Sequence, residues 1–171
     1  VSGIRGSQEA SIFNKRTAAT VVDSIAATDI GKLPDVTISD SLQRISGVQI
    51  RRTAGEGGSL NIRGLPQVVT QLNGEQYLGA NSVVSTQPNF SDIPSPLFRG
   101  ADVFKNATAN LGNAGITGTV NLKTYRPFDF EEGSTFSGAA EMQRGDETKK
   151  NDPNLSALYN WQNGDVGFMI S

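Results

Sequence analysis

The stretch that decides the fold is ADVFKNATANLGNAGITGTVNLKTYRPFDF, residues 101–130. Two short runs in it, 101–105 and 119–124, are rich in apolar and β-favouring residues and predict strands. A Gly-rich segment between them is typical of a tight turn. Tyr125-Arg126-Pro127 then ends the second run, because proline lacks the backbone donor that a strand ladder needs. We therefore expect a strand–turn–strand unit that closes a domain near residue 126.

Upstream of this unit, brief strand candidates alternate with turn residues. Ile38, Leu42 and Ile45 recur at helical spacing and predict one short helix, with Gly47 at the C-terminal cap. Asn73-Gly74 marks a turn. Residues 1–20 are polar without a sustained period, and we expect an extended lead-in there. The result is a small mixed α+β domain over 21–126, with further strands at 21–25, 48–52, 60–63 and 68–72.

The last part of the chain changes character. From Ser134 to Arg144 apolar and polar residues alternate, over a length that suits a tilted membrane strand of about 9–11 residues. A charged loop follows, then a second alternating run from Leu155, a two-residue Asn163-Gly164 hairpin turn and a third run to Ile170. Such alternation is typical of an outer-membrane barrel, but an ordinary antiparallel sheet with one solvated face alternates in the same way. The alternation alone leaves both readings open.

Composition excludes several classes of function. Cysteine and histidine are absent, which removes disulfides, thiol and Ser-His-Asp catalysis and the usual zinc sites. We therefore expect no enzyme, no catalytic residue, no metal and no cofactor. The net charge of -2 gives no electrostatic argument for a nucleic-acid partner. Only 36% of the residues are hydrophobic while 19 are glycine, which favours turns, strands and wet contacts over a thick core.

Four blocks in order, DSLQRISGVQIRR, LNIRGL, LNGEQ and the 101–130 stretch, resemble the plug domain of TonB-dependent outer-membrane receptors. The resemblance covers about residues 20–130 and extends into the first barrel strands. It assigns Gly64, Gly115 and Gly118 to the plug turns. Thr117 departs from it, since the family often has another glycine there, and Ser46 stands where a proline is common.

The resemblance implies the fold class and the partners. The expected fold is an α+β plug, a small mixed sheet with short helices, inside an antiparallel transmembrane β-barrel of which only the first strands are present. Residues 1–20 would form a lead-in after the TonB box, 21–126 the plug and 127–171 about three barrel strands. The expected partners are TonB with its inner-membrane energising complex, outer-membrane lipid, and an extracellular small solute or oligosaccharide.

The implied function is TonB-dependent active uptake of a scarce solute across the bacterial outer membrane, with the plug gating the lumen. Arg63 and Arg99 are candidates for plug–barrel ion pairs, because a guanidinium holds a carboxylate bidentately. No Lys or Arg occurs from 65 to 98, which favours a neutral glycan over an anionic ferric siderophore. The candidates for contact with the solute are the amides and aromatics of the long irregular stretch: Gln76, Tyr77, Asn81, Gln87, Asn89 and Phe90.

Three alternatives stay open. The solute could be a ferric siderophore or another metal chelate. The protein could be a receptor that mainly relays ligand occupancy to a regulator through an additional N-terminal domain. It could also be a soluble periplasmic binding module with a β-rich tail.

Overall fold

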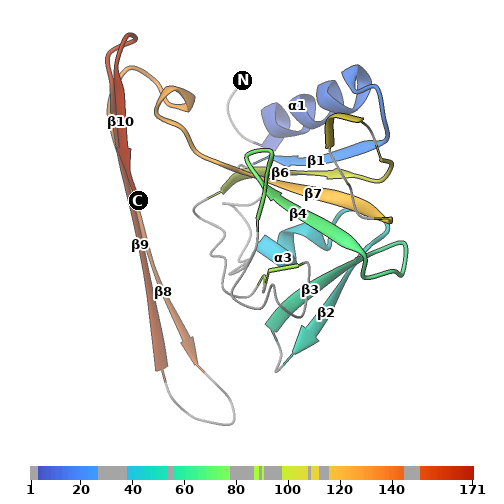
Figure 1. The fold of residues 1–171 in the computed structure, drawn as a ribbon. Helices are drawn as coiled ribbons and strands as arrows, with labels where there is room; N and C mark the ends of the chain where they lie inside the picture. Colours follow the sequence, from blue (N-terminus) through green and yellow to red (C-terminus); the bar gives the residue numbers. More distant parts are fainter. Residues whose placement is uncertain are drawn as a thin grey trace. The chain divides into compact units, whose positions relative to one another are not determined.

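The computed structural model describes residues 4–26, 38–53, 56–77, 87–88, 90, 98–107, 109–111, 116–144 and 151–171 (Figure 1). It divides into two compact units, Val1–Thr124 and Tyr125–Ser171. We call them the first and the second unit and describe each by itself.

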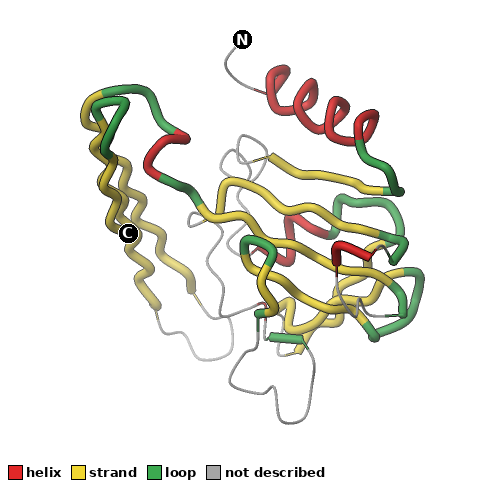
Figure 2. Tube along the Cα trace, turned by 45° about the horizontal axis from the view of Figure 1, so that its top comes forward, coloured by secondary structure: helices red, strands yellow, loops and turns green. Residues whose placement is uncertain are grey.

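The first unit is built on a mixed five-stranded sheet (Figure 2). Every neighbouring pair is antiparallel except β4 and β7, which run parallel, so the sheet mixes hairpin and crossover connections. The strand predictions at 21–25, 48–52, 68–72 and 119–124 are confirmed to within one residue at each end. In spatial order the strands are β1 (Val22–Ala26), β6 (Phe98–Phe104), β7 (Gly118–Thr124), β4 (Val68–Leu72) and β5 (Glu75–Gln76).

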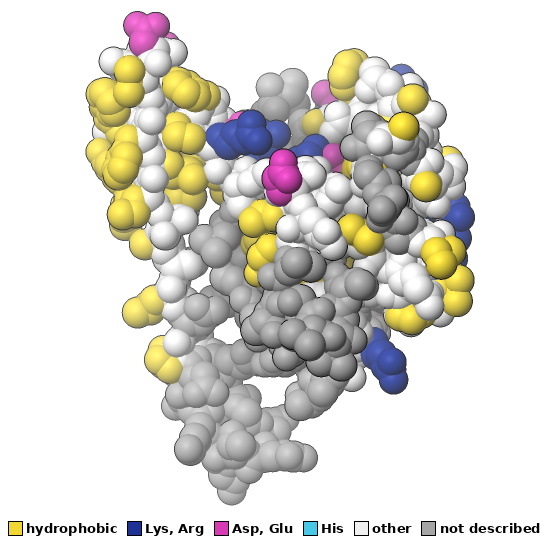
Figure 3. Space-filling model, viewed as in Figure 1, with side chains coloured by type: hydrophobic (Ala, Val, Ile, Leu, Met, Phe, Trp, Pro, Cys, Tyr) yellow, Lys and Arg dark blue, Asp and Glu magenta, His cyan; other side chains and the backbone are white. Residues whose placement is uncertain are grey.

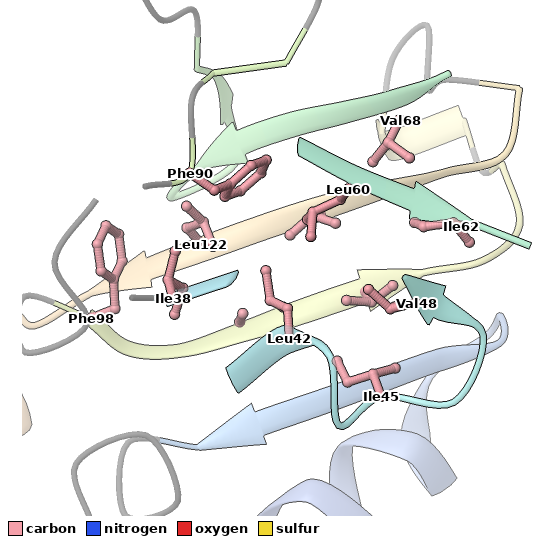
Figure 4. Packing of buried hydrophobic residues seen from close by; sticks show 13 residues of the cluster. Ile38, Leu42, Ile45, Val48, Leu60, Ile62, Val68, Phe90, Phe98 and Leu122 are labelled. Atoms are coloured by element: carbon pink, nitrogen blue, oxygen red, sulfur yellow. The ribbon is translucent and has the colours of Figure 1, made fainter. Parts of the chain in front are cut away.

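A separate hairpin and a short helix complete the core. The hairpin pairs β2 (Val48–Thr53) with β3 (Glu56–Ile62), and the predicted helix is α3 (Ile38–Leu42). Strand β3 begins earlier than predicted, because the glycines after Glu56 lie inside the strand, where a register shift near Arg51 and Arg52 accommodates them. Figure 4 shows side chains from α3, the hairpin and the sheet meeting in one cluster: Ile38, Leu42, Ile45, Val48, Leu60, Ile62, Val68, Phe90, Phe98 and Leu122.

The predicted extended lead-in is wrong: the chain forms helix α1 (Ile4–Thr17), which lies beside β1 (Figures 1 and 2). Local interactions explain the helix better than burial does. Arg5 and Glu9 form an i,i+4 ion pair of 3.8 Å, and Lys15 and Arg16 in the last turn complement the helix dipole. Ile12 and Phe13 remain exposed. A helix with so weak an apolar stripe gives little periodic signal in the sequence.

The second unit is a three-stranded antiparallel sheet of order β10-β9-β8, preceded by the 3-10 turn η4 (Pro127–Asp129). Its strands are β8 (Gly133–Arg144), β9 (Asn151–Gln162) and β10 (Gly167–Ile170). Strand β9 includes Pro153, which was predicted in a loop. Pro153 lies near the start of β9, opposite Met142 of β8.

The turn predicted at Asn163-Gly164 is in place but longer than expected. The loop runs from Asn163 to Val166, since β9 ends at Gln162 and β10 begins at Gly167. The Asn163 side chain accepts hydrogen bonds from the Asp165 and Val166 amides at 3.2 and 2.8 Å. This side-chain turn takes the place of a two-residue β-turn.

Candidate functional site

The predicted solute contacts divide into two groups. Gln76 is exposed on β5, and Tyr77 is half-buried against the core cluster. Gln87 and Phe90, in contrast, are buried, with 5% and 0% of their surface exposed. Their assignment as outward-facing contacts is therefore wrong. Asn81 and Asn89 lie outside the described residues.

Gln87 is buried because its amide completes the hydrogen bonding of β3. Its Oε1 accepts from the Leu60 amide at 2.9 Å, and its Nε2 donates to the Leu60 carbonyl at 2.9 Å and to the Pro66 carbonyl at 2.6 Å. The side chain thus acts as a short piece of neighbouring strand. A buried amide with three partners is part of the scaffold rather than a contact for solute.

The exposed candidates stand on a tight hairpin. Asn73 and Gly74 both have positive φ, 52° and 91°, the combination of a type I′ turn. This turn joins β4 to β5, whose Glu75 and Gln76 pair with Leu72 and Gln71. Gln76 is therefore presented at a defined position on a short hairpin.

Arg63 stands on a second turn of the same kind. Its φ is 53° and that of Gly64 is 82°, and Ile62 and Leu65 exchange hydrogen bonds across the turn at 3.0 and 3.1 Å. A left-handed conformation favours Gly or Asn, so an arginine there is held at some conformational cost. The side chain is exposed, and within the described part of the chain it has no acidic partner. Arg99 is also exposed, at a register shift in β6.

Of the predicted turn glycines, Gly118 is the most constrained. Its φ is +153°, and a Cβ placed on it would lie 2.5 Å from the Phe104 carbonyl oxygen and 3.0 Å from Ile62 Cδ1. Beside it, Thr117 fits the turn despite its side chain, because its hydroxyl donates to the Gln67 carbonyl at 2.9 Å. Gly115 lies outside the described residues.

The sequence analysis missed an ion-pair cluster between α1, β1 and the turn after α3. The Asp23 carboxylate accepts from Lys15 at 2.6 Å and from Lys105 at 2.5 Å, and Lys105 also donates to the Ser46 carbonyl at 2.6 Å. These residues and Arg44 line an open cleft of about 420 Å³. The only signal in the sequence was an aspartate inside a short predicted strand.

This cluster sets the protonation of Asp23. Partial burial raises the pKa of its carboxyl, but the hydrogen bonds and positive charges of Lys105 and Lys15 outweigh burial and hold the pKa below its ordinary value. The carboxylate is therefore charged at neutral pH and joins α1 to the sheet.

Hydrophobic side chains gather over the second unit, at the upper left of Figure 3. Directly opposite residues on neighbouring strands share a face, and here Phe136 faces Tyr159 while Trp161 faces Phe168. The opposite face holds Asn160 and Gln162, which are buried and donate to the Pro127 and Phe130 carbonyls at 3.2 and 2.9 Å. The exposed side chains of the apolar face are Phe136, Met142, Leu155, Tyr159, Trp161, Phe168 and Ile170.

Two other kinds of feature are absent from the described residues. No group of three or more acidic side chains gathers there in a way that could hold a metal ion. Among the helices of those residues, none is long and apolar enough to cross a membrane.

Residues 14–119 match the family model described as TonB-dependent Receptor Plug Domain. The match covers more than half of the chain, so the chain belongs to this family. It carries the plug domain of a TonB-dependent receptor of the bacterial outer membrane, and the family is one of transporters and receptors. The α+β plug fold expected from the sequence is confirmed. No curated protein matches the chain.

Solved receptors share the fold at low sequence identity. The siderophore receptor PirA from Acinetobacter baumannii is 20% identical with a TM-score of 0.65, over 89% of this chain and 23% of that one. The hemophore receptor HasR from Serratia marcescens is 18% identical with a TM-score of 0.65, over 91% and 24%. The alcaligin receptor FauA from Bordetella pertussis is 17% identical with a TM-score of 0.61, over 85% and 24%. The chain thus spans about a quarter of the length of these receptors.

Proposed function

We propose that the protein takes up a scarce solute actively across the outer membrane, with TonB and its inner-membrane complex supplying the energy. The observation that carries this proposal is the match of residues 14–119 to the plug family. In this proposal residues 1–20 lead from the TonB box, 21–126 form the plug and 127–171 begin the barrel. The protein carries out transport and no enzymatic reaction.

For the solute, we favour a neutral oligosaccharide. Gln76 is exposed on β5, where an amide can hydrogen-bond sugar hydroxyls, and Tyr77 beside it offers part of an aromatic ring for stacking. No cationic side chain occurs between residues 65 and 98 to grip an anion. On binding, the sugar hydroxyls would exchange hydrogen bonds to water for hydrogen bonds to these side chains.

An anionic metal chelate is the second candidate, because one observation favours it. Arg51 and Arg52 are exposed near the tip of the β2–β3 hairpin. Arg52 forms an ion pair with Asp40 at 2.8 Å. Arg51 is therefore the arginine better placed to bind a carboxylate of the chelate. PirA is described as a siderophore receptor, HasR as a hemophore receptor and FauA as an alcaligin receptor.

Arg63 would seat the plug by pairing with an acidic side chain of the barrel lumen. Its exposed guanidinium and its costly backbone conformation support this role. An exposed pair of this kind can exchange with water, so it can hold a plug that also has to move.

The test is uptake by cells that carry the full-length receptor, with and without TonB. The probes are a radiolabelled neutral glucose oligomer and ferric citrate as an anionic chelate. We expect one probe to accumulate only where TonB is present, with Gln76→Ala lowering uptake of the oligomer or Arg51→Ala lowering uptake of the chelate. Arg63→Ala should increase passive leakage of small solutes. Equal accumulation with and without TonB would contradict active transport.

A further inference from the structure

Where the pairing of β4 with β7 ends, a side-chain oxygen takes the place of a backbone carbonyl as hydrogen-bond acceptor. In a regular parallel ladder, a residue bonds to two residues of the neighbouring strand. Its N–H donates to the carbonyl of the first, and its carbonyl accepts from the N–H of the second, which lies two positions further along that strand. Asn73 makes the first of these bonds, since its amide donates to the Leu122 carbonyl at 2.8 Å. The second would join the Thr124 amide to the Asn73 carbonyl.

The Asn73 side chain makes that second bond instead. At a φ of 52° the chain turns into β5, and it is Oδ1 that accepts from the Thr124 amide, at 3.1 Å. The same side chain donates through Nδ2 to the Thr124 hydroxyl at 2.9 Å. The next residue is also tied down, because the Gly74 amide donates to Asn121 Oδ1 at 2.9 Å.

These bonds connect two places that matter for transport. On one side is the β4–β5 hairpin with Gln76, held by the Tyr77 amide donating to the Thr70 carbonyl at 2.9 Å. On the other side is Thr124, the last residue of the first unit, from which the chain continues to Tyr125 and the second unit. The side chain of one residue thus bridges the hairpin and the point where the chain leaves the sheet.

We propose that Asn73 is a positioning residue that makes the solute-contact hairpin and the exit of β7 move as one body. The role of the hairpin rests on the proposed function above. A displacement of β5 by bound solute would then change the restraint on Thr124, and a change at Thr124 would in turn change the hairpin. Such coupling is reciprocal by thermodynamic necessity.

The test uses amide hydrogen exchange of the full-length receptor in detergent, without solute. Asn73→Gly keeps the left-handed turn but removes both side-chain bonds. Each bond contributes modestly, so we expect exchange of the Thr124 amide to become about tenfold faster. The amides of β6, paired on the other side of β7, should stay unchanged. Unchanged exchange at Thr124 would overturn the proposal.

Two further variants separate positioning from general structural support. Asn73→Asp tolerates the left-handed turn and can accept from both the Thr124 amide and its hydroxyl, so it should restore protection. Thr124→Val removes the hydroxyl that accepts from Asn73 Nδ2 and changes no residue of the hairpin itself. We nevertheless expect exchange of the Tyr77 amide to rise about threefold. No effect at Tyr77 would overturn the coupling.

The same variants then enter the uptake assay described above. We expect Asn73→Gly to lower uptake of whichever probe the wild type accumulates, and Asn73→Asp to retain it. Normal uptake by Asn73→Gly would overturn the positioning role. If the wild type accumulated neither probe by a TonB-dependent route, the proposed function would fail, and the exchange measurements would still decide the coupling.

Discussion

Gly118 and Gly64 both have positive φ, but different surroundings make them unequal. At Gly64 a Cβ would meet nothing within 4 Å, whereas at Gly118 it would meet the Phe104 carbonyl oxygen at 2.5 Å. Substitution of Gly64 therefore costs conformational strain alone. Substitution of Gly118 adds a collision with backbone that cannot rotate away.

We predict that Gly118→Ala lowers the free energy of local opening of β7 by about 2–4 kcal/mol. The matched control, Gly64→Ala, should cost about 1–2 kcal/mol, the usual penalty of a left-handed alanine. In the full-length receptor, hydrogen exchange of the β7 amides measures the first loss, and exchange of the Leu65 amide, which donates across the Gly64 turn, measures the second. Equal losses in the two variants would mean that the close approach at Gly118 is not a constraint.

For single residues, the sequence predicted turn positions better than it predicted which side chains are buried. The Asn73-Gly74 turn could be predicted, because its residue types suit left-handed backbone. The burial of Phe90 and Gln87 could not, because neither lies in a periodic segment. Both are placed by partners distant in sequence, such as Leu60 for Gln87, and no local pattern carries that information.

Among the elements, α1 is joined to the sheet by an ion pair to one carboxylate of β1. Lys15 of α1 reaches Asp23 of β1, and Lys105 holds the other oxygen of the same carboxylate. Protonation of Asp23 would remove the acceptor from both lysines. Lys15, Lys105 and Arg44 would then repel one another around the cleft.

We predict that acid weakens this tie in a defined range of pH. The pKa of Asp23 is depressed in the folded state, so its stabilising effect is fully present above the ordinary value of 3.8 and is lost as pH falls through the lower folded value. Protection of the β1 amides, corrected for intrinsic exchange, should be constant from neutral pH to about pH 5 and fall below about pH 4. Asp23→Asn should have low protection throughout. An unchanged pH profile in that variant would assign the loss to another group.

Most elements could be predicted from the sequence where their periodicity was strong. The strands at 48–52 and 68–72 and the helix around Leu42 are in place, because each buries an alternating or helical set of apolar residues. Helix α1 was missed, because local charge pairs rather than a buried stripe support it. The early start of β3 was missed because glycines seldom indicate a strand.

For the whole molecule, the central feature is that a polar plug is followed in the chain by strands with one apolar face. Exposed apolar side chains on β8, β9 and β10 would be costly in water over so continuous a surface. In the proposed barrel, lipid would remove this cost, because it would solvate the apolar side chains while the strands satisfied one another's backbone groups. The polar face of the same strands, with Asn160 and Gln162, suits a wet lumen.

The most direct test places single nitroxide labels on the two faces of β8 and β9 in the full-length receptor in lipid vesicles. Residues 1–171 contain no cysteine. Any cysteine elsewhere in the full-length receptor is first replaced by serine, so that each introduced cysteine is labelled alone. Labels at Phe136→Cys and Leu155→Cys should be relaxed by oxygen dissolved in the lipid, and labels at Thr135→Cys and Ser156→Cys by a water-soluble nickel chelate. Relaxation of all four labels by the nickel chelate would contradict the account.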